Sequence, residues 1–154
     1  MNEKMLILSR SIRKDICEIE RIYDALARHT LSSDTDAETA IVVAYYLRNL
    51  YNGFENIFGA IAAAFENSID DVGRWHTQLL ERMRLDVMPL RPAVIDDEAF
   101  EALDELRRFR HLFRHAYGVR LDPLRLQLVL QKALRLRKLY PAQLGAFTVF
   151  LERL

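Results

Sequence analysis

The stretch AETAIVVAYYLRNLYNGFENIFGAIAAAFEN, residues 37–67, decides the fold of this chain. It contains no proline, and its apolar residues fall on most sides of a helix: Ile41, Val42, Val43, Ala44, Leu47, Leu50, Phe54, Ile57, Phe58 and Ile61. A helix that is apolar around most of its circumference is buried on several sides, as at the centre of a bundle or at an oligomer interface. The stretch therefore predicts a central helix with other helices packed around it.

The sequence on either side of this stretch supplies further helices. Upstream, apolar residues recur at steps of three or four, which predicts a first helix over about residues 3–29. Downstream, Ser68 is expected to cap a third helix that ends near Leu85. Two prolines within residues 87–93 then predict a loop.

Two more helices are expected in the C-terminal part. A fourth helix should start at Asp96 or Asp97 and run to about Tyr117, before a glycine. Pro123, which follows an aspartate suited to an N-cap, opens a fifth helix that Pro141 either kinks or divides. With no internal repeat or linker, residues 1–154 are predicted to form one all-α domain, a bundle of four or five helices.

The composition is that of a globular protein that can bury a core without disulfides. Of the 154 residues, 51% are hydrophobic and 29% are charged, which excludes a disordered or fibrous chain. A single cysteine, Cys17, excludes an intrachain disulfide and a multi-thiolate metal site. The longest apolar stretch without charge, near residues 57–65, is shorter than the ~18 residues that a membrane span needs. The N-terminus resembles no signal peptide, so we expect a cytoplasmic protein.

The net charge of zero hides an uneven distribution along the chain. Residues 1–105 carry 11 basic and 20 acidic side chains, whereas residues 106–150 carry 10 basic side chains and one acidic. Such a split has two interpretations: the basic part faces a polyanion, or acidic early helices simply pack beside basic late ones.

Candidate chemistry lies on the predicted fourth helix, in the segment RRFRHLFRHAY over residues 107–117. No metalloprotease, phosphate-loop or hydrolase signature occurs in the chain. His111 and His115, four residues apart, could ligate a metal, but the neighbouring arginines would repel a cation and no carboxylate lies close in sequence. We therefore expect no metal and no cofactor.

Arginine with histidine suits metal-free cleavage of RNA. Arginine binds phosphate oxygens bidentately and stabilises the added charge of the transition state, while histidine transfers protons near neutral pH. On a helical wheel, however, Arg110 and His115 lie roughly 140° apart, so one straight helix does not aim both at one small target. A second copy of the helix across a symmetry axis would solve this. The simpler alternative is a solvated basic face with incidental histidines.

The residues Arg110–Tyr117 read R-x4-H-x-Y, which resembles the signature of HEPN-domain proteins. The trailing tyrosine is similar to that of the HepT-like toxin branch of HEPN/MNT toxin–antitoxin pairs. The segment Tyr51–Phe58 also resembles a Tyr-x-x-x-Glu stretch of the family. The resemblance implies a HEPN-type helical bundle that forms a homodimer, with two motifs facing one cleft.

By this resemblance, Arg110 binds the scissile phosphate and His115 is the general acid/base. His111 supports the site as the polar residue after the arginine. Arg114 is an alternative phosphate ligand, because arginines are dense around the motif. Glu55 either orients a motif arginine or forms an ordinary ion pair between helices.

The resemblance also implies a partner and a modification. Tyr117 would receive AMP from an MNT-type nucleotidyltransferase antitoxin, although an amphipathic tyrosine at a helix end is also explained by half-buried packing. The leading hypothesis is a metal-independent endoribonuclease toxin that acts on RNA, without membrane association. The alternative is a non-catalytic helical dimer that binds and regulates a nucleotidyltransferase, and a plain structural bundle is the third hypothesis.

Overall fold

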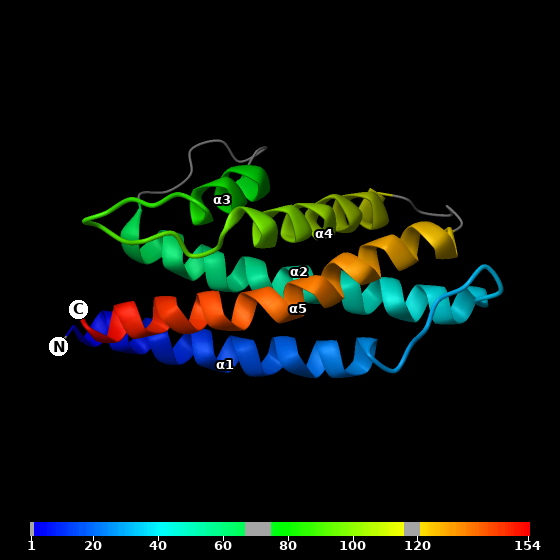
Figure 1. Cartoon of the computed structure of the whole chain (residues 1–154), viewed down its shortest axis with the longest axis horizontal. Helices are drawn as coiled ribbons and strands as arrows, with labels where there is room; N and C mark the ends of the chain where they lie inside the picture. The colour runs from blue at the N-terminus through cyan, green and yellow to red at the C-terminus, as the bar shows by residue number, and fades with distance from the viewer. Residues whose placement is uncertain (1, 67–74, 116–120) are drawn as a thin grey trace.

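The computed structural model describes residues 2–66, 75–115 and 121–154, with the backbone alone at Arg114 and His115. Over these ranges the chain forms five helices and no strand (Figure 1). They are α1 (Glu3–Leu26), α2 (Ala37–Phe65), α3 (Trp75–Met83), α4 (Asp97–His115) and α5 (Pro123–Glu152). The predicted all-α bundle of four or five helices is confirmed.

Helix α2 lies at the centre of the bundle, as its sequence predicts. It packs against α1, α3, α4 and α5, and its side chains from Val43 to Ile61 form much of the buried core. Only its first turns depart from this pattern, because Ile41, Val42 and Tyr45 are exposed. Long helices α1 and α5 lie side by side with both termini at the same end, while α3 and α4 cover α2 from the other side (Figure 1).

Several helix ends differ from the sequence-based expectation by a few residues. Helix α1 ends at Leu26, a turn earlier than expected, and α3 ends at Met83. The start of α4 is as expected, because Asp96 Oδ1 accepts a hydrogen bond from the Ala99 amide at 2.8 Å. The predicted cap Ser68 lies outside the described residues.

Helix α5 contains a proline and yet is not divided. It runs as one element over residues 123–152, with Pro141 inside it. Its start follows the prediction, because Asp122 Oδ1 accepts from the Leu124 amide at 3.0 Å. Pro141 has no backbone N–H to donate to the preceding turn. The packing of α5 against three other helices stabilises the helix in spite of this lost hydrogen bond.

The interface of α1 and α5 holds a partly buried polar cluster. The Tyr23 hydroxyl donates to the Ala133 carbonyl at 2.8 Å, and the Tyr140 hydroxyl donates to Glu20. Arg137 donates to the same glutamate at 2.7 Å, and its guanidinium lies over the Tyr23 ring. Burial is the main cause that raises the pKa of both tyrosines well above its ordinary value.

Ion pairs between early and late segments account for much of the uneven charge. Five basic side chains of residues 106–150 pair with acids of residues 1–105: Arg107, Arg108, Arg110, Arg135 and Arg137. Arg107 and Arg108 pair with Asp104 on α4 itself, and the other three pairs join different helices, as expected when acidic early helices pack beside basic late ones. The charge split alone is therefore weak support for a polyanion surface.

Candidate functional site

Arg110 projects from α4 onto α2, where polar side chains receive it. Its Nη1 donates to Asn52 Oδ1 at 2.8 Å and to Glu55 Oε1 at 3.0 Å, and its Nη2 donates to Glu55 Oε2 at 3.4 Å. The arginine side chain is 12% exposed and that of Glu55 is 10% exposed. The two form a nearly buried, bidentate ion pair, which fixes the plane of the guanidinium.

The arginine is packed as well as paired. Its guanidinium carbon lies 4.8 Å from the centre of the Tyr51 ring, at cation–π distance. Burial and the negative charge of Glu55 raise the pKa of Tyr51 well above its ordinary value, while Arg110 acts to lower it. Tyr51 is therefore a neutral platform at neutral pH.

A histidine from α3 completes this group of side chains. His76 Nδ1 lies 2.7 Å from Glu55 Oε2 and 3.0 Å from Arg110 Nη2. Its ring meets the Trp75 ring edge-on, with centroids 5.0 Å apart. Three helices thus bring a histidine, a carboxylate and an arginine into contact.

This cluster borders a small cavity of about 60 Å³ that His76, Arg107, Arg110 and His111 line. Arg107 is itself paired with Asp104, at 2.9 Å from Nε to Oδ1. All four lining side chains bear nitrogen donors, so the cavity suits an anionic group.

The structure brings together some of the sequence-predicted residues and leaves others undescribed. Arg110 and Glu55 are in contact, and His111 lies on the exposed side of α4 at the cavity. The backbone of α4 continues through His115, but the side chains of Arg114 and His115, and the whole of Tyr117, lie outside the described residues. Their predicted roles remain predictions.

Two members of the cluster were missed by reasoning from sequence. Asn52 stands three residues before Glu55, which puts both on one face of α2, and this spacing was a usable signal. His76 carried no such signal. It is 34 residues from Arg110 in the chain, and only the packing of α3 on α2 and α4 brings it there.

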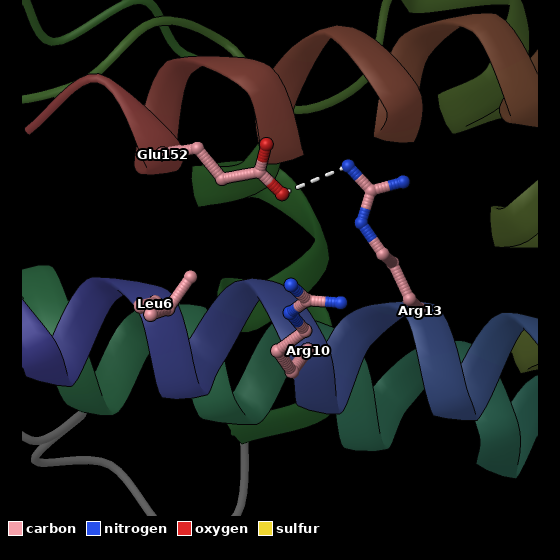
Figure 2. Close-up of a pocket in the computed structure, with 4 residues that line it drawn as sticks. All are labelled: Leu6, Arg10, Arg13 and Glu152. Carbon is pink, nitrogen blue, oxygen red and sulfur yellow. Dashed lines mark hydrogen bonds and ion pairs between the residues drawn. The ribbon is translucent and has the colours of Figure 1, made fainter.

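A second, larger hollow is formed by side chains of α1 and α5, at the end of the bundle where both termini lie (Figure 1). It has a volume of about 550 Å³ and is lined by Leu6, Arg10, Arg13 and Glu152 (Figure 2). The Glu152 carboxylate accepts from Ser9 at 2.7 Å and from Arg13 at 2.9 Å, and these contacts lower its pKa. With no histidine among its lining residues, this hollow lacks a proton-transfer group active near neutral pH.

Among the described residues, no group of three or more histidine, cysteine or acidic side chains is arranged to hold a metal ion. None of the helices in the described ranges is long and apolar enough to cross a membrane.

Comparison with known proteins gives one match. The model of a family described as "HepT-like protein" matches residues 42–151, a span that begins in α2 and ends in α5. No curated protein and no solved structure matches the chain. The matched region includes Glu55, His76 and Arg110, and the five-helix bundle agrees with the fold that the R-x4-H-x-Y resemblance implies. The chain therefore belongs to the HepT-like family of HEPN-domain proteins.

Proposed function

We propose that this protein is a metal-independent endoribonuclease, the toxin of a HEPN/MNT-type toxin–antitoxin pair. The observation that carries the proposal is the fixed guanidinium of Arg110, held by Glu55 and Asn52 at the edge of a cavity lined by nitrogen donors. Family membership supplies the context in which this arginine stands first in R-x4-H-x-Y.

The proposed reaction is transesterification within the RNA. The 2′-hydroxyl loses its proton and attacks the adjacent phosphorus, and the bond from phosphorus to the 5′-oxygen breaks as that oxygen gains a proton. Arg110 binds the phosphate oxygens and stabilises the charge that grows on them. His115 transfers a proton as general acid/base, with His111 and Arg114 supporting the site.

A homodimer is part of this proposal. Arg110 points at α2, and the helical arithmetic places His115 on a different side of the same α4 helix. Two copies of α4 across a symmetry axis would bring an arginine of one chain near a histidine of the other. Exposed Leu112 on α4 is consistent with a partner surface beside the motif.

Control of the nuclease is proposed to act through Tyr117. AMP added there by an MNT-type nucleotidyltransferase places a phosphodiester and a nucleoside beside the arginines of the motif. It then competes with RNA for both charge and space.

Cleavage assays on the purified protein test the proposal. Arg110→Ala should reduce the rate about 10²–10³-fold and His115→Ala about 10²–10⁴-fold, with circular dichroism unchanged and activity resistant to EDTA. Arg21→Ala is the matched control, because Arg21 is a 76% exposed arginine paired with Glu18 on α1. Mixing the Arg110→Ala chain with the His115→Ala chain should restore some activity if residues of both subunits form the site. Loss of activity on chelation, restored by a divalent ion, would reject the mechanism.

Control through Tyr117 has a separate test. Co-expression with a neighbouring nucleotidyltransferase should add the mass of AMP to the peptide containing Tyr117. Tyr117→Phe should still cleave RNA and should resist neutralisation. If the phenylalanine variant is neutralised as well as the wild type, inhibition works by complex formation instead.

One observation favours a second candidate function, a non-catalytic dimer that binds and regulates a nucleotidyltransferase. Arg110 is only 12% exposed and already has a carboxylate partner, so its positive charge is neutralised in the resting protein. Expression of the chain without its partner distinguishes the two functions. Growth arrest that Arg110→Ala abolishes supports the nuclease, whereas unimpaired growth supports the binding module.

A further inference from the structure

We propose that His76 is a second proton-transfer residue of this site, the general base that activates the 2′-hydroxyl of RNA. The proposal rests on the nuclease function proposed above. It concerns a residue outside the R-x4-H-x-Y motif, on a different helix from Arg110 and His115.

The geometry assigns the proton on the His76 ring. Glu55 Oε2 lies 2.7 Å from His76 Nδ1 and 3.4 Å from Arg110 Nη2, so this oxygen accepts hydrogen bonds from both nitrogens. The 3.0 Å between Nδ1 and Nη2 is then the separation of two donors that share one acceptor. An unprotonated Nδ1 would instead place its lone pair against the negatively charged carboxylate, which is unfavourable. Nδ1 therefore carries hydrogen.

This assignment leaves the other ring nitrogen for chemistry. In the neutral ring a protonated Nδ1 means that Nε2 holds the lone pair, which is the form that a general base needs. The side chain of His76 is 41% exposed and lines the cavity beside Arg110. Trp75 and Glu55 hold the ring in place while it remains open to a ligand.

The Glu55 carboxylate lies against the ring that gains a proton in the base step. When Nε2 takes the proton of the 2′-hydroxyl, the ring becomes an imidazolium beside the Glu55 carboxylate. The groups that face His76 are Glu55 from α2 and Arg107, Arg110 and His111 from α4. Arg110 is already neutralised by the same carboxylate, which limits its repulsion of the new positive charge.

The resulting step is balanced. The electron pair of the 2′-oxygen–hydrogen bond becomes the new bond to phosphorus as the proton moves to Nε2 of His76. The bond from phosphorus to the 5′-oxygen breaks, and that oxygen takes a proton from a general acid, the role left to His115. The products are a 2′,3′-cyclic phosphate and a 5′-hydroxyl, and the two histidines end with exchanged protonation states.

Two substitutions separate proton transfer from positioning. His76→Gln keeps an N–H that can donate to Glu55 but removes the titrating ring, whereas His76→Ala removes both. Single-turnover cleavage by His76→Gln should fall about 10²–10⁴-fold, and added imidazole should restore part of the activity of His76→Ala. His29→Gln, in the segment that follows α1, is the matched control and should cleave at the wild-type rate.

A substrate with sulfur in place of the 5′-bridging oxygen distinguishes base from acid, because a thiolate leaves without protonation. His115→Ala should recover on this substrate, and His76→Gln should remain slow. Recovery of His76→Gln on it, or cleavage by His76→Gln within about threefold of wild type, would overturn the proposal while the nuclease function stands. A wild-type protein that cleaves no RNA would instead contradict the proposed function itself.

Discussion

Two glutamates, one within α2 and one at its C-cap, each bind an arginine, with different results. Glu55 lies inside the helix, and Glu66 is the C-cap residue, with an extended backbone. Glu66 pairs with Arg91 from the loop between α3 and α4, and Glu55 pairs with Arg110 from α4 itself. Arg91 is fully buried, whereas Arg110 borders a cavity.

Arg91 is fully buried, and all five of its N–H donors are used. Nε and Nη2 donate to Glu66, and the remaining hydrogens go to the backbone carbonyls of Leu85, Pro92 and Arg82 at 3.0–3.1 Å. Because backbone carbonyls cannot move away without unfolding the loop, this arginine fastens the loop to α2. No donor is left for a ligand.

Arg110 is held by side chains instead. Its partners within the described residues are Asn52, Glu55 and the ring of Tyr51, and the contacts to oxygen use only the terminal nitrogens. Side chains can change rotamer when a phosphate arrives, and donors remain for it. Both arginines form an ion pair with a glutamate, so the ion pair does not decide the role. An arginine held by backbone carbonyls acts as a structural clamp, whereas one held by side chains can also bind a ligand.

The largest expected effect on stability comes from the loss of the ion pair between Arg91 and Glu66. Arg91→Ala leaves Glu66 with only Arg82 among the described residues, at 3.4 Å, and leaves three buried carbonyls without donors, so the free energy of unfolding should fall by about 3–5 kcal/mol. Urea denaturation followed by circular dichroism measures this. Arg21→Ala, which removes an exposed ion pair, should have little effect. Equal losses for the two variants would contradict the role of Arg91 as a clamp.

Loss of the ion pair between Arg110 and Glu55 should affect stability less. After Arg110→Ala, Glu55 keeps His76 as a donor and lies beside the cavity, so the free energy of unfolding should fall by only about 1–2 kcal/mol. The same denaturation experiment provides the measurement. A loss as large as that of Arg91→Ala would show that the two pairs are equivalent clamps and would weaken the case for a ligand site at Arg110.

The fold could be predicted from sequence because periodicity is a local property. The apolar circumference of residues 37–67 predicted a central helix, and Asp122 with Pro123 marked the start of α5. The continuation of α5 through Pro141 could not be predicted, because packing against neighbouring helices outweighs the local cost of proline. Likewise, the local pattern did not predict that Ile41 and Val42 would be exposed.

The site was only partly predictable, for a related reason. The resemblance of two segments to the HEPN family indicated Arg110, in the R-x4-H-x-Y motif, and Glu55, in the Tyr51–Phe58 stretch. The contact between them follows from the packing of α4 on α2, which the sequence only suggested. His76 depends on where α3 folds back, a tertiary property with no signature in the residues around it.

Alkaline pH should test, through a tyrosine in each, whether the site is as closed to water as the core. Burial raises the pKa of Tyr51 above its ordinary value of 10.0, so this tyrosine ionises first in the unfolded chain. Its contribution to stability is complete below about pH 10 and is lost as pH rises towards the folded-state pKa. Tyr51→Phe should reduce the decline in unfolding free energy above pH 10 by up to ~1.4 kcal/mol per pH unit.

The core supplies the reference for that measurement. Tyr23→Phe should flatten the alkaline decline by a similar amount, because its pKa is also raised mainly by burial. If Tyr23→Phe flattens the decline and Tyr51→Phe does not, water already reaches Tyr51 in the resting protein. The site would then be more open than its burial indicates.

The smallest expected effect tests how strongly the Arg110–Glu55 pair depends on the packing of α2 against α1. Gly53 lies between Asn52 and Glu55 on α2, and a Cβ there would come within 2.9 Å of Cγ1 of Ile19 on α1. Alanine gains helix propensity of up to about 1 kcal/mol, but Ile19 is buried and β-branched, so relieving the contact costs about 1–3 kcal/mol. Gly53→Ala should therefore destabilise the protein by about 1 kcal/mol and lower cleavage several-fold as α2 shifts under Arg110.

Gly145→Ala on α5, where a Cβ meets nothing within 4 Å, is the control and should stabilise the protein without changing cleavage. If Gly53→Ala also stabilises and leaves cleavage unchanged, the position of Glu55 is set by α4 and α3 alone, and α1 has no part in holding the site.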